Sequence, residues 1–171
     1  MGMVAKLPNN ESEQIDAFED AQTCYLETLS LIERLHRLQL DLIKDEFERL
    51  GRDDINSVQA LLVFNIGDQE LTAGELKTRG HYQGSNVSYN LKKLVEGGFI
   101  HHQRSAADRR TVRIRLTEQG QEVRRLVGEL HDRHLRDLSE NDSAGVEQLG
   151  ALREAMRGLE RYWRDQIRHI Y

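Results

Sequence analysis

The sequence predicts a mainly α-helical protein with a small β-hairpin. Over most of the 171 residues, apolar side chains recur at spacings of three and four, the spacing of one face of a helix. Strict alternation of apolar and polar residues, which is typical of a strand, is confined to a short segment after residue 110. Pro8 is the only proline, so the helical pattern is rarely interrupted. The sequence therefore predicts long helices before and after a single hairpin.

The first predicted element is a long helix from Ile15 to Leu50. Residues 1–14 are polar and are expected to form a disordered tail. The apolar arc of the helix is wider than one buried stripe, so we expect it to pack both on its own domain and on another chain. Gly51 follows it as a suitable C-terminal cap.

Two shorter helices are predicted next. One follows Asn56, a capping residue, and ends near Gly67. The other begins at Thr72, because Glu75 lies three residues later, the spacing at which each side chain can bond the backbone amide of the other residue. Residues 80–84 include two glycines and are expected to form a turn. The region therefore reads as a helix, a turn and the start of another helix.

That further helix is predicted from Ser85 to the glycine pair at 97–98, with an apolar back and a polar front. A front of small polar, amide, aromatic and basic groups suits the major groove of DNA, where base edges lie beside phosphates. The front consists of Ser85, Asn86, Ser88, Tyr89, Lys92 and Lys93. We interpret it as a candidate recognition helix, although this helix alone fits an ordinary amphipathic surface helix equally well.

A basic β-hairpin is predicted directly after this helix. Residues 99–104 and 111–116 are short strand-like runs joined by residues 105–110. On the second strand Arg113 and Arg115 share one face, whereas the apolar residues turn inward. The candidate DNA contacts of the hairpin are Arg104, Asp108, Arg109, Arg110 and Arg113.

The charge distribution supports a DNA-binding module between Leu71 and Leu116. From Lys77 to Arg115 the chain has nine basic and two acidic residues, a net charge of +7, although the whole chain carries −5. The other residues are 15 basic and 27 acidic, a net charge of −12, so one surface can attract phosphate while the rest repels it. A helix-turn-helix followed by a basic hairpin is the order of a winged helix-turn-helix. The alternative is a solvated basic surface without a partner.

The C-terminal region is predicted to form two helices. Thr117 caps the first, and the second follows residues 141–143 with a heptad-like apolar pattern. We expect residues 15–52 and 117–171 to form a helical dimerisation region that flanks a winged helix-turn-helix DNA-binding domain at 53–116. A bundle formed within one chain is the alternative.

Several classes of protein are excluded by what the sequence lacks. Cys24 is the only cysteine, so no internal disulfide or four-cysteine zinc site can form, which fits a reducing compartment and predicts a cytoplasmic protein. No apolar run is long enough to span a membrane, and no signal peptide is recognisable. Glycine-rich phosphate loops, nucleophile elbows and zinc-protease motifs are missing. We therefore expect neither an enzyme nor a cofactor or metal.

From about Ile15 onward the sequence resembles the MarR family of bacterial winged-helix regulators. The resemblance depends on residues 85–100, which are similar to the recognition helix, glycine turn and first wing strand of that family. It depends also on Asp108-Arg109-Arg110 followed by Arg113, and on residues 116–120, which resemble the wing signature and the entry to the next helix. The segment at 79–84 is longer and more glycine-rich than the usual turn of the family, which suggests a subgroup such as the PetP/LdtR-like regulators.

The resemblance implies a homodimer on a pseudo-palindromic DNA operator, with the two recognition helices one DNA turn, about 10 base pairs, apart. It implies that Asp108 orients Arg110 for the minor groove and that Arg109 lies at the wing tip. By chemical type, Asn86 can pair with an adenine edge, whereas Lys92 and Lys93 suit the DNA backbone.

Family members release DNA when a small molecule enters a crevice or when a cysteine is oxidised. The candidates here are Cys24 as a redox sensor and Tyr25, His36 and Phe64 as crevice residues. Each of these is otherwise an ordinary packing position. The predicted function is thus a sequence-specific transcriptional regulator that responds to a small molecule or an oxidant. The alternative is an architectural or protein-interaction winged-helix module.

Overall fold

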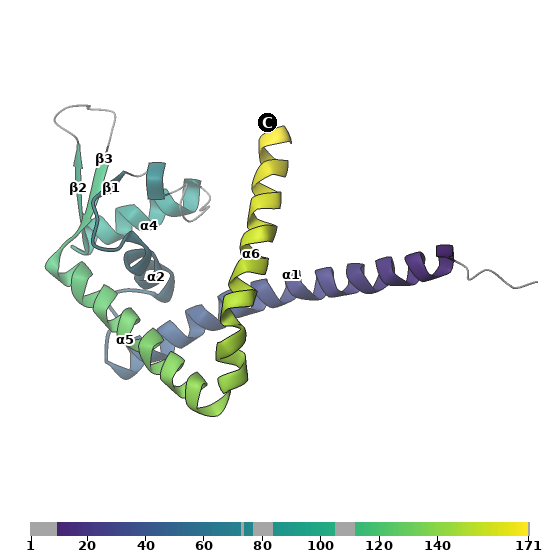
Figure 1. The fold of residues 1–171 in the computed structure, drawn as a ribbon. Coiled ribbons are helices and arrows are strands. Elements are labelled where there is room, and N and C mark those ends of the chain that lie inside the picture. Colours follow the sequence, from purple (N-terminus) through teal and green to yellow (C-terminus); the bar gives the residue numbers. More distant parts are fainter. Residues whose placement is uncertain (1–9, 73, 77–83, 105–111, 171) are drawn as a thin grey trace, which may run out of the picture. The chain divides into compact units, whose positions relative to one another are not determined.

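The computed structural model describes residues 10–72, 74–76, 84–104 and 112–170 (Figure 1). The elements in chain order are α1 (Asn10–Arg49), α2 (Ser57–Ile66), β1 (Leu71–Thr72), α4 (Gly84–Glu96), β2 (Ile100–Arg104), β3 (Val112–Leu116), α5 (Glu118–Asn141) and α6 (Ser143–Ile170). The expected fold class, mainly helical with a small hairpin, is confirmed. Within the described ranges, no helix is both long and apolar enough to cross a membrane.

The chain divides into two compact units, Met1–Val58 and Gln59–Tyr171. The first contains α1, which begins at Asn10, so residues 10–14 are helical rather than part of a tail. The spacing of apolar residues identifies only the part of a helix that buries a face. It therefore gives no indication of the polar first turn of α1. The predicted cap at Gly51 is confirmed: its φ is +68°, and Arg52 N donates to the carbonyl of Phe47 over 2.8 Å.

The second unit is built on a three-stranded antiparallel sheet in the order β1-β3-β2 (Figure 1). The predicted hairpin pairs Ile100 with Leu116 at one end and Arg104 with Val112 at the other. Leu71 of β1 pairs with Ile114 on the opposite side of β3. Sequence reasoning missed β1, because a strand of two residues is too short to show alternation.

The core of the second unit lies where α2, α4, the sheet and α5 bury their apolar side chains. Its largest fully buried members are Phe99, Ile66, Leu76, Leu94, Ile114, Val63, Val87, Val123 and Val127. Burying apolar surface at about 25 cal/mol per Å² is the main favourable contribution to folding in such a core. This core provides the rigid base on which α4 and the hairpin are held.

The start of α5 is bonded to the turn between α4 and β2. Thr117 caps α5 as predicted, since Gly120 N donates to its hydroxyl over 3.1 Å. The same hydroxyl donates to the carbonyl of Gly98 over 2.7 Å, and Thr117 N donates to the carbonyl of Phe99 over 3.0 Å. A Cβ at Gly120 would come within 2.1 Å of that Phe99 carbonyl oxygen. The close approach of α5 to this turn therefore requires glycine.

Candidate nucleic-acid interface

The capping box ahead of the predicted turn is formed as expected. Thr72 N donates to a carboxylate oxygen of Glu75 over 2.7 Å, and Glu75 N donates to the Thr72 hydroxyl over 3.1 Å. Residues 74–76 are helical, and Leu76 is buried. Residues 77–83, with Lys77, Arg79 and most of the predicted turn, lie outside the described residues, and Gly84, the last residue of that turn in the prediction, is the first residue of α4.

The two faces of α4 differ as the sequence predicts. Its back is buried through Val87, Leu91 and Leu94. The front side chains that are described, Asn86, Ser88, Tyr89, Lys92 and Lys93, are all exposed. Tyr89 keeps 60% of its surface exposed, which is a large apolar area to leave in water. Ser85 lies in the first turn of the same helix, and its side chain is outside the described part.

The end of α4 is fixed by a glycine turn that leads into β2. Gly98 has a φ of +77°, a conformation that glycine adopts without strain. Phe99 N donates to the carbonyl of Leu94 over 2.9 Å, and Gly98 N donates to that of Val95 over 3.1 Å. This pattern of bonds closes the helix and satisfies carbonyls that would otherwise lack donors. The recognition-helix candidate and the hairpin are thereby held in one fixed arrangement.

Lys92, Lys93 and Glu96 form one cluster at the C-terminal end of α4. The carboxylate of Glu96 lies 2.9 Å from Lys93 Nζ and 3.8 Å from Lys92 Nζ. The hydrogen bond from Lys93 lowers the pKa of Glu96, and the same bond raises the pKa of Lys93. Exposed ion pairs are weak, so a DNA phosphate can replace Glu96 as the partner of either lysine.

Asn86 is bonded to Asn90 one helical turn further on. Asn90 Nδ2 donates to the backbone carbonyl of Asn86 over 3.0 Å and to its side-chain Oδ1 over 2.8 Å. Asn90 is only 7% exposed, whereas Asn86 is exposed. Sequence reasoning assigned no role to Asn90, and nothing in its spacing from other residues distinguishes it from an ordinary helix position.

One face of the hairpin collects polar and cationic side chains from both strands. Arg115 pairs with His101 and Arg113 pairs with Gln103, and cross-strand partners project from the same face. All of them are exposed. Sequence reasoning recognised the two arginines but did not predict that His101 and Gln103 would stand beside them, because strand register joins them.

The two arginines of this face differ in their partners. Arg113 Nη1 donates to Glu70 Oε1 over 2.5 Å, and this hydrogen bond raises the pKa of Arg113. Arg115 has no carboxylate partner among the described residues. Arg115 is therefore the more available cation, although it was not among the predicted DNA contacts.

Several predicted contacts are not placed by the structure. Asp108, Arg109 and Arg110 lie outside the described residues, and Arg104 belongs to β2 with its side chain outside the described part. The described residues thus give the base of the wing, and the roles of Asp108, Arg109 and Arg110 stay predictions.

The candidate sensing residues belong to both units. On α1, Cys24 and His36 are exposed and Tyr25 is 41% exposed. Phe64 lies on α2 in the second unit, half-buried, with its ring 5.0 Å from the His131 ring in a T-shaped contact. His131 Nε2 is buried without a hydrogen-bond partner in the described part of the chain, and burial lowers its pKa. No group of three or more possible metal ligands occurs among the described residues.

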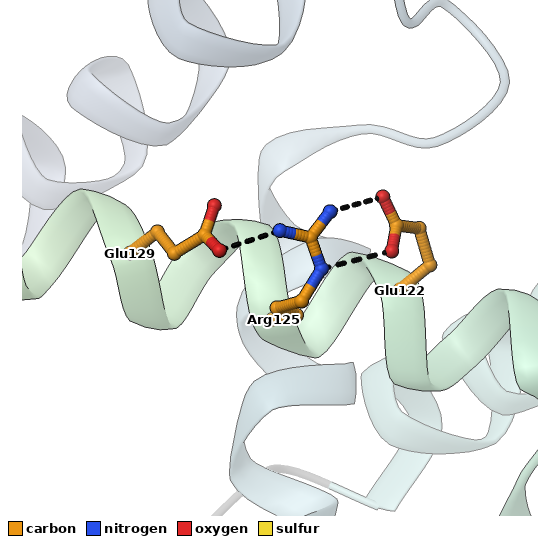
Figure 2. A network of polar contacts seen from close by, with 3 residues as sticks. All are labelled: Glu122, Arg125 and Glu129. Atoms are coloured by element: carbon orange, nitrogen blue, oxygen red, sulfur yellow. Dashed lines mark hydrogen bonds and ion pairs between the residues drawn. The ribbon is translucent and has the colours of Figure 1, made fainter.

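The exposed side of α5 carries a different kind of charge cluster (Figure 2). Arg125 donates two hydrogen bonds to Glu122, over 3.0 and 2.6 Å, and one to Glu129 over 2.5 Å. These bonds raise the pKa of Arg125. Two carboxylates on one guanidinium leave a negative charge in excess, so this part of α5 is unsuited to phosphate.

The comparisons with known proteins agree with this geometry. The family model described as a winged helix DNA-binding domain matches residues 55–120. The exopolysaccharide II synthesis transcriptional activator ExpG of Rhizobium meliloti (strain 1021) is 34% identical over 174 residues, covering 97% of this chain and 89% of that protein.

Two solved structures share the fold of this chain. FabT of Streptococcus pneumoniae, solved in complex with DNA, has a TM-score of 0.62 and 21% identity over 83% of this chain and 99% of that one. A mutant of MarR from E. coli, solved with operator DNA, has a TM-score of 0.59 and 21% identity over 74% of this chain and 91% of that one. With the winged-helix match and the relative aligned over nearly its whole length, the chain belongs to the MarR family of winged-helix transcriptional regulators.

Proposed function

We propose that this protein binds a pseudo-palindromic DNA operator as a homodimer and regulates transcription from the adjoining promoter. The observation that carries the proposal is the exposed front of α4, where amide, hydroxyl, phenol and ammonium groups lie above an apolar back. Such a helix offers both hydrogen bonds for base edges and cations for phosphates. The exposed arginines of β3 add a second cationic surface on the hairpin that follows α4.

The homodimer is supported by the apolar row of α6. Leu149, Leu152, Met156, Trp163 and Ile167 recur at helical spacing, and all stay exposed in the single chain. Leu152 is 53% exposed. A row of this length is costly to leave in water, and a second copy of the chain would cover it in a symmetric assembly.

Whether the protein activates or represses transcription is proposed from its similarity to a named relative. ExpG of R. meliloti is a transcriptional activator. Activation is therefore the outcome we propose for this chain, to be tested with a reporter gene behind the selected operator. An architectural winged-helix module, the alternative, would bind unrelated DNA as tightly as the operator at the same salt concentration.

The test begins with selection of bound sequences from random DNA by the full-length protein. We expect an inverted repeat whose half-sites are about 10 base pairs apart and a preference over unrelated DNA of at least about a thousandfold. Selected sequences without an inverted repeat would contradict the dimeric mode, and equal affinity for all DNA would contradict the function.

The dimer is tested in the same preparations with Leu152→Glu. A charge in the apolar row should lower the mass measured by sedimentation from dimer to monomer and should weaken operator binding. Gly150→Glu is the matched control, because it adds the same charge where a side chain meets nothing within 4 Å. A dimer that survives Leu152→Glu would reject this row as the interface.

The response to an oxidant is a further part of the proposal, and the exposure of Cys24 supports it. Thiol oxidation requires solvent access, which Cys24 has on α1. Peroxide should release operator DNA from the wild type but not from Cys24→Ser. Equal release from both proteins would reject Cys24 as the redox switch.

A further inference from the structure

The orientation of the Asn86 amide is determined by two hydrogen bonds from Asn90. The backbone carbonyl of Asn86 can only accept, so the Asn90 atom 3.0 Å from it must be the donor Nδ2. The same Nδ2 lies 2.8 Å from the Asn86 side chain, so the atom that it meets there must be the acceptor Oδ1. Together the two bonds determine which atom is nitrogen and which is oxygen in the side-chain amides of both Asn86 and Asn90.

This assignment determines which hydrogen bonds Asn86 can make outside the protein. Its Oδ1 is directed along α4 toward Asn90, and its Nδ2 has no hydrogen-bond partner among the described residues. Asn86 is exposed in the first turns of α4, beside Tyr89. Its amide therefore faces solvent as a hydrogen-bond donor.

An asparagine reads adenine in the major groove with both atoms of its amide, accepting from N6 and donating to N7. The bond from Asn90 occupies one lone pair of Oδ1 and directs this oxygen along α4, so the arrangement disfavours a contact in which both amide atoms meet one adenine edge. Guanine presents two adjacent acceptors, N7 and O6, to a donor, whereas adenine presents one acceptor, N7, beside the N6 donor, and cytosine presents only a donor. The hydrogen bonds of Asn86 thus change the expectation, based on its chemical type, that it reads adenine.

We propose that Asn90 is a specificity-determining positioning residue, which holds Asn86 as a donor and so directs it to guanine rather than adenine. The proposal rests on the proposed function, because it requires α4 to meet base edges. Asn90 itself is buried and contacts DNA only through Asn86. Because Asn90 is buried, the bond that sets the amide orientation is partly shielded from water, although Asn86 itself is exposed.

Substitutions at Asn90 should alter base preference in two different directions. Asn90→Leu keeps the branching at Cγ but has no amide, so Asn86 is released and can rotate to contact adenine with both atoms. Asn90→Asp replaces the donor by a carboxylate, which accepts from Asn86 Nδ2 and turns Oδ1 outward. The outward oxygen then accepts from cytosine or adenine, and the preference for guanine is reversed.

The experiment compares sequences selected from random DNA by the wild type, Asn86→Ala, Asn90→Leu and Asn90→Asp. Asn86→Ala should lose preference at one position in each half-site, where the wild type selects guanine. At that position the ratio of adenine to guanine affinity should rise about tenfold in Asn90→Leu. Replacing that guanine with 7-deazaguanine, which lacks N7, should weaken the wild type but not Asn86→Ala.

The controls separate positioning from a loss of folding. Asn90→Leu added to Asn86→Ala should cause no further change in base preference, because Asn90 acts only through Asn86. Thermal unfolding identifies a variant that fails to fold, and the 7-deazaguanine comparison needs no substitution at Asn90.

A wild type that selects adenine at this position would overturn the proposal, as would Asn90 variants that keep guanine or an Asn86→Ala variant with unchanged preferences. In each of these cases specific binding itself persists. A wild type without any sequence preference would instead contradict the proposed function.

Discussion

Two clusters of three charged residues in the second unit have opposite net charges. On α4 one carboxylate, that of Glu96, is shared by two lysines. On α5 one guanidinium, that of Arg125, is shared by two glutamates (Figure 2). Both clusters are exposed and use residues three or four apart on a helix.

The ratio of acids to bases alone decides what each cluster attracts. The α4 cluster has one positive charge in excess and the α5 cluster one negative charge. A chain with a net charge of −5 can therefore present a surface for DNA, because its acids gather on other helices. Net charge by itself would have excluded this function, whereas the local excess on α4 supports it.

The largest effect is expected from disrupting the contact between α5 and the turn that follows α4. These two helices carry the clusters. Gly120→Ala places a Cβ 2.1 Å from the carbonyl oxygen of Phe99, where the start of α5 meets the turn after α4. Backbone must move to relieve this clash, so the free energy of unfolding should fall by about 3 kcal/mol in urea titrations.

Gly150→Ala is the control for that measurement. A Cβ there meets nothing within 4 Å, and alanine is the better helix former, so stability should rise by about 0.5–1 kcal/mol. If Gly120→Ala were as stable as the wild type, the close packing of α5 against this turn would be wrong.

The next effect in size tests the positive excess on α4. Removing both cations with Lys92→Ala and Lys93→Ala should weaken binding to all sequences alike, because ammonium groups bind phosphates rather than bases. The slope of log affinity against log salt should become shallower by about 0.9 for each phosphate that the protein no longer neutralises. The same measurement on Arg125→Ala should give the wild-type slope, since that guanidinium is already held by two carboxylates. Equal slopes in all three proteins would show that the α4 cluster does not meet phosphate.

Features that depend on neighbouring residues were predictable from the sequence. The capping box at Thr72, the cap at Thr117 and the glycine end at Gly51 involve side chains and amides within a few residues, so their spacing alone indicates them. The hairpin was equally predictable, because apolar and polar residues alternate along a strand that buries one face.

Features that join distant segments were not predictable in the same way. The ion pair between Arg113 and Glu70 spans 43 positions and depends on β1, which is too short to recognise. The direction of the Asn86 amide depends on the side-chain geometry of Asn90, which a pattern of residue types does not contain. Sequence reasoning thus identified the helix that bears the candidate site but not the hydrogen bonds that orient its side chains.

The smallest effect is expected when a single acid is altered in each cluster. Glu96→Gln removes the carboxylate that Lys92 and Lys93 share, so both ammonium groups become available to phosphate, and operator affinity should rise a few-fold at low salt. Glu129→Gln removes one charge of the same sign from the α5 cluster and should leave the affinity nearly unchanged, because Glu122 still neutralises Arg125. The gain from Glu96→Gln should fade as salt is added, since exposed charges are screened. Equal gains from the two substitutions would mean that only the total charge of the chain matters, and that the position of the excess on α4 does not.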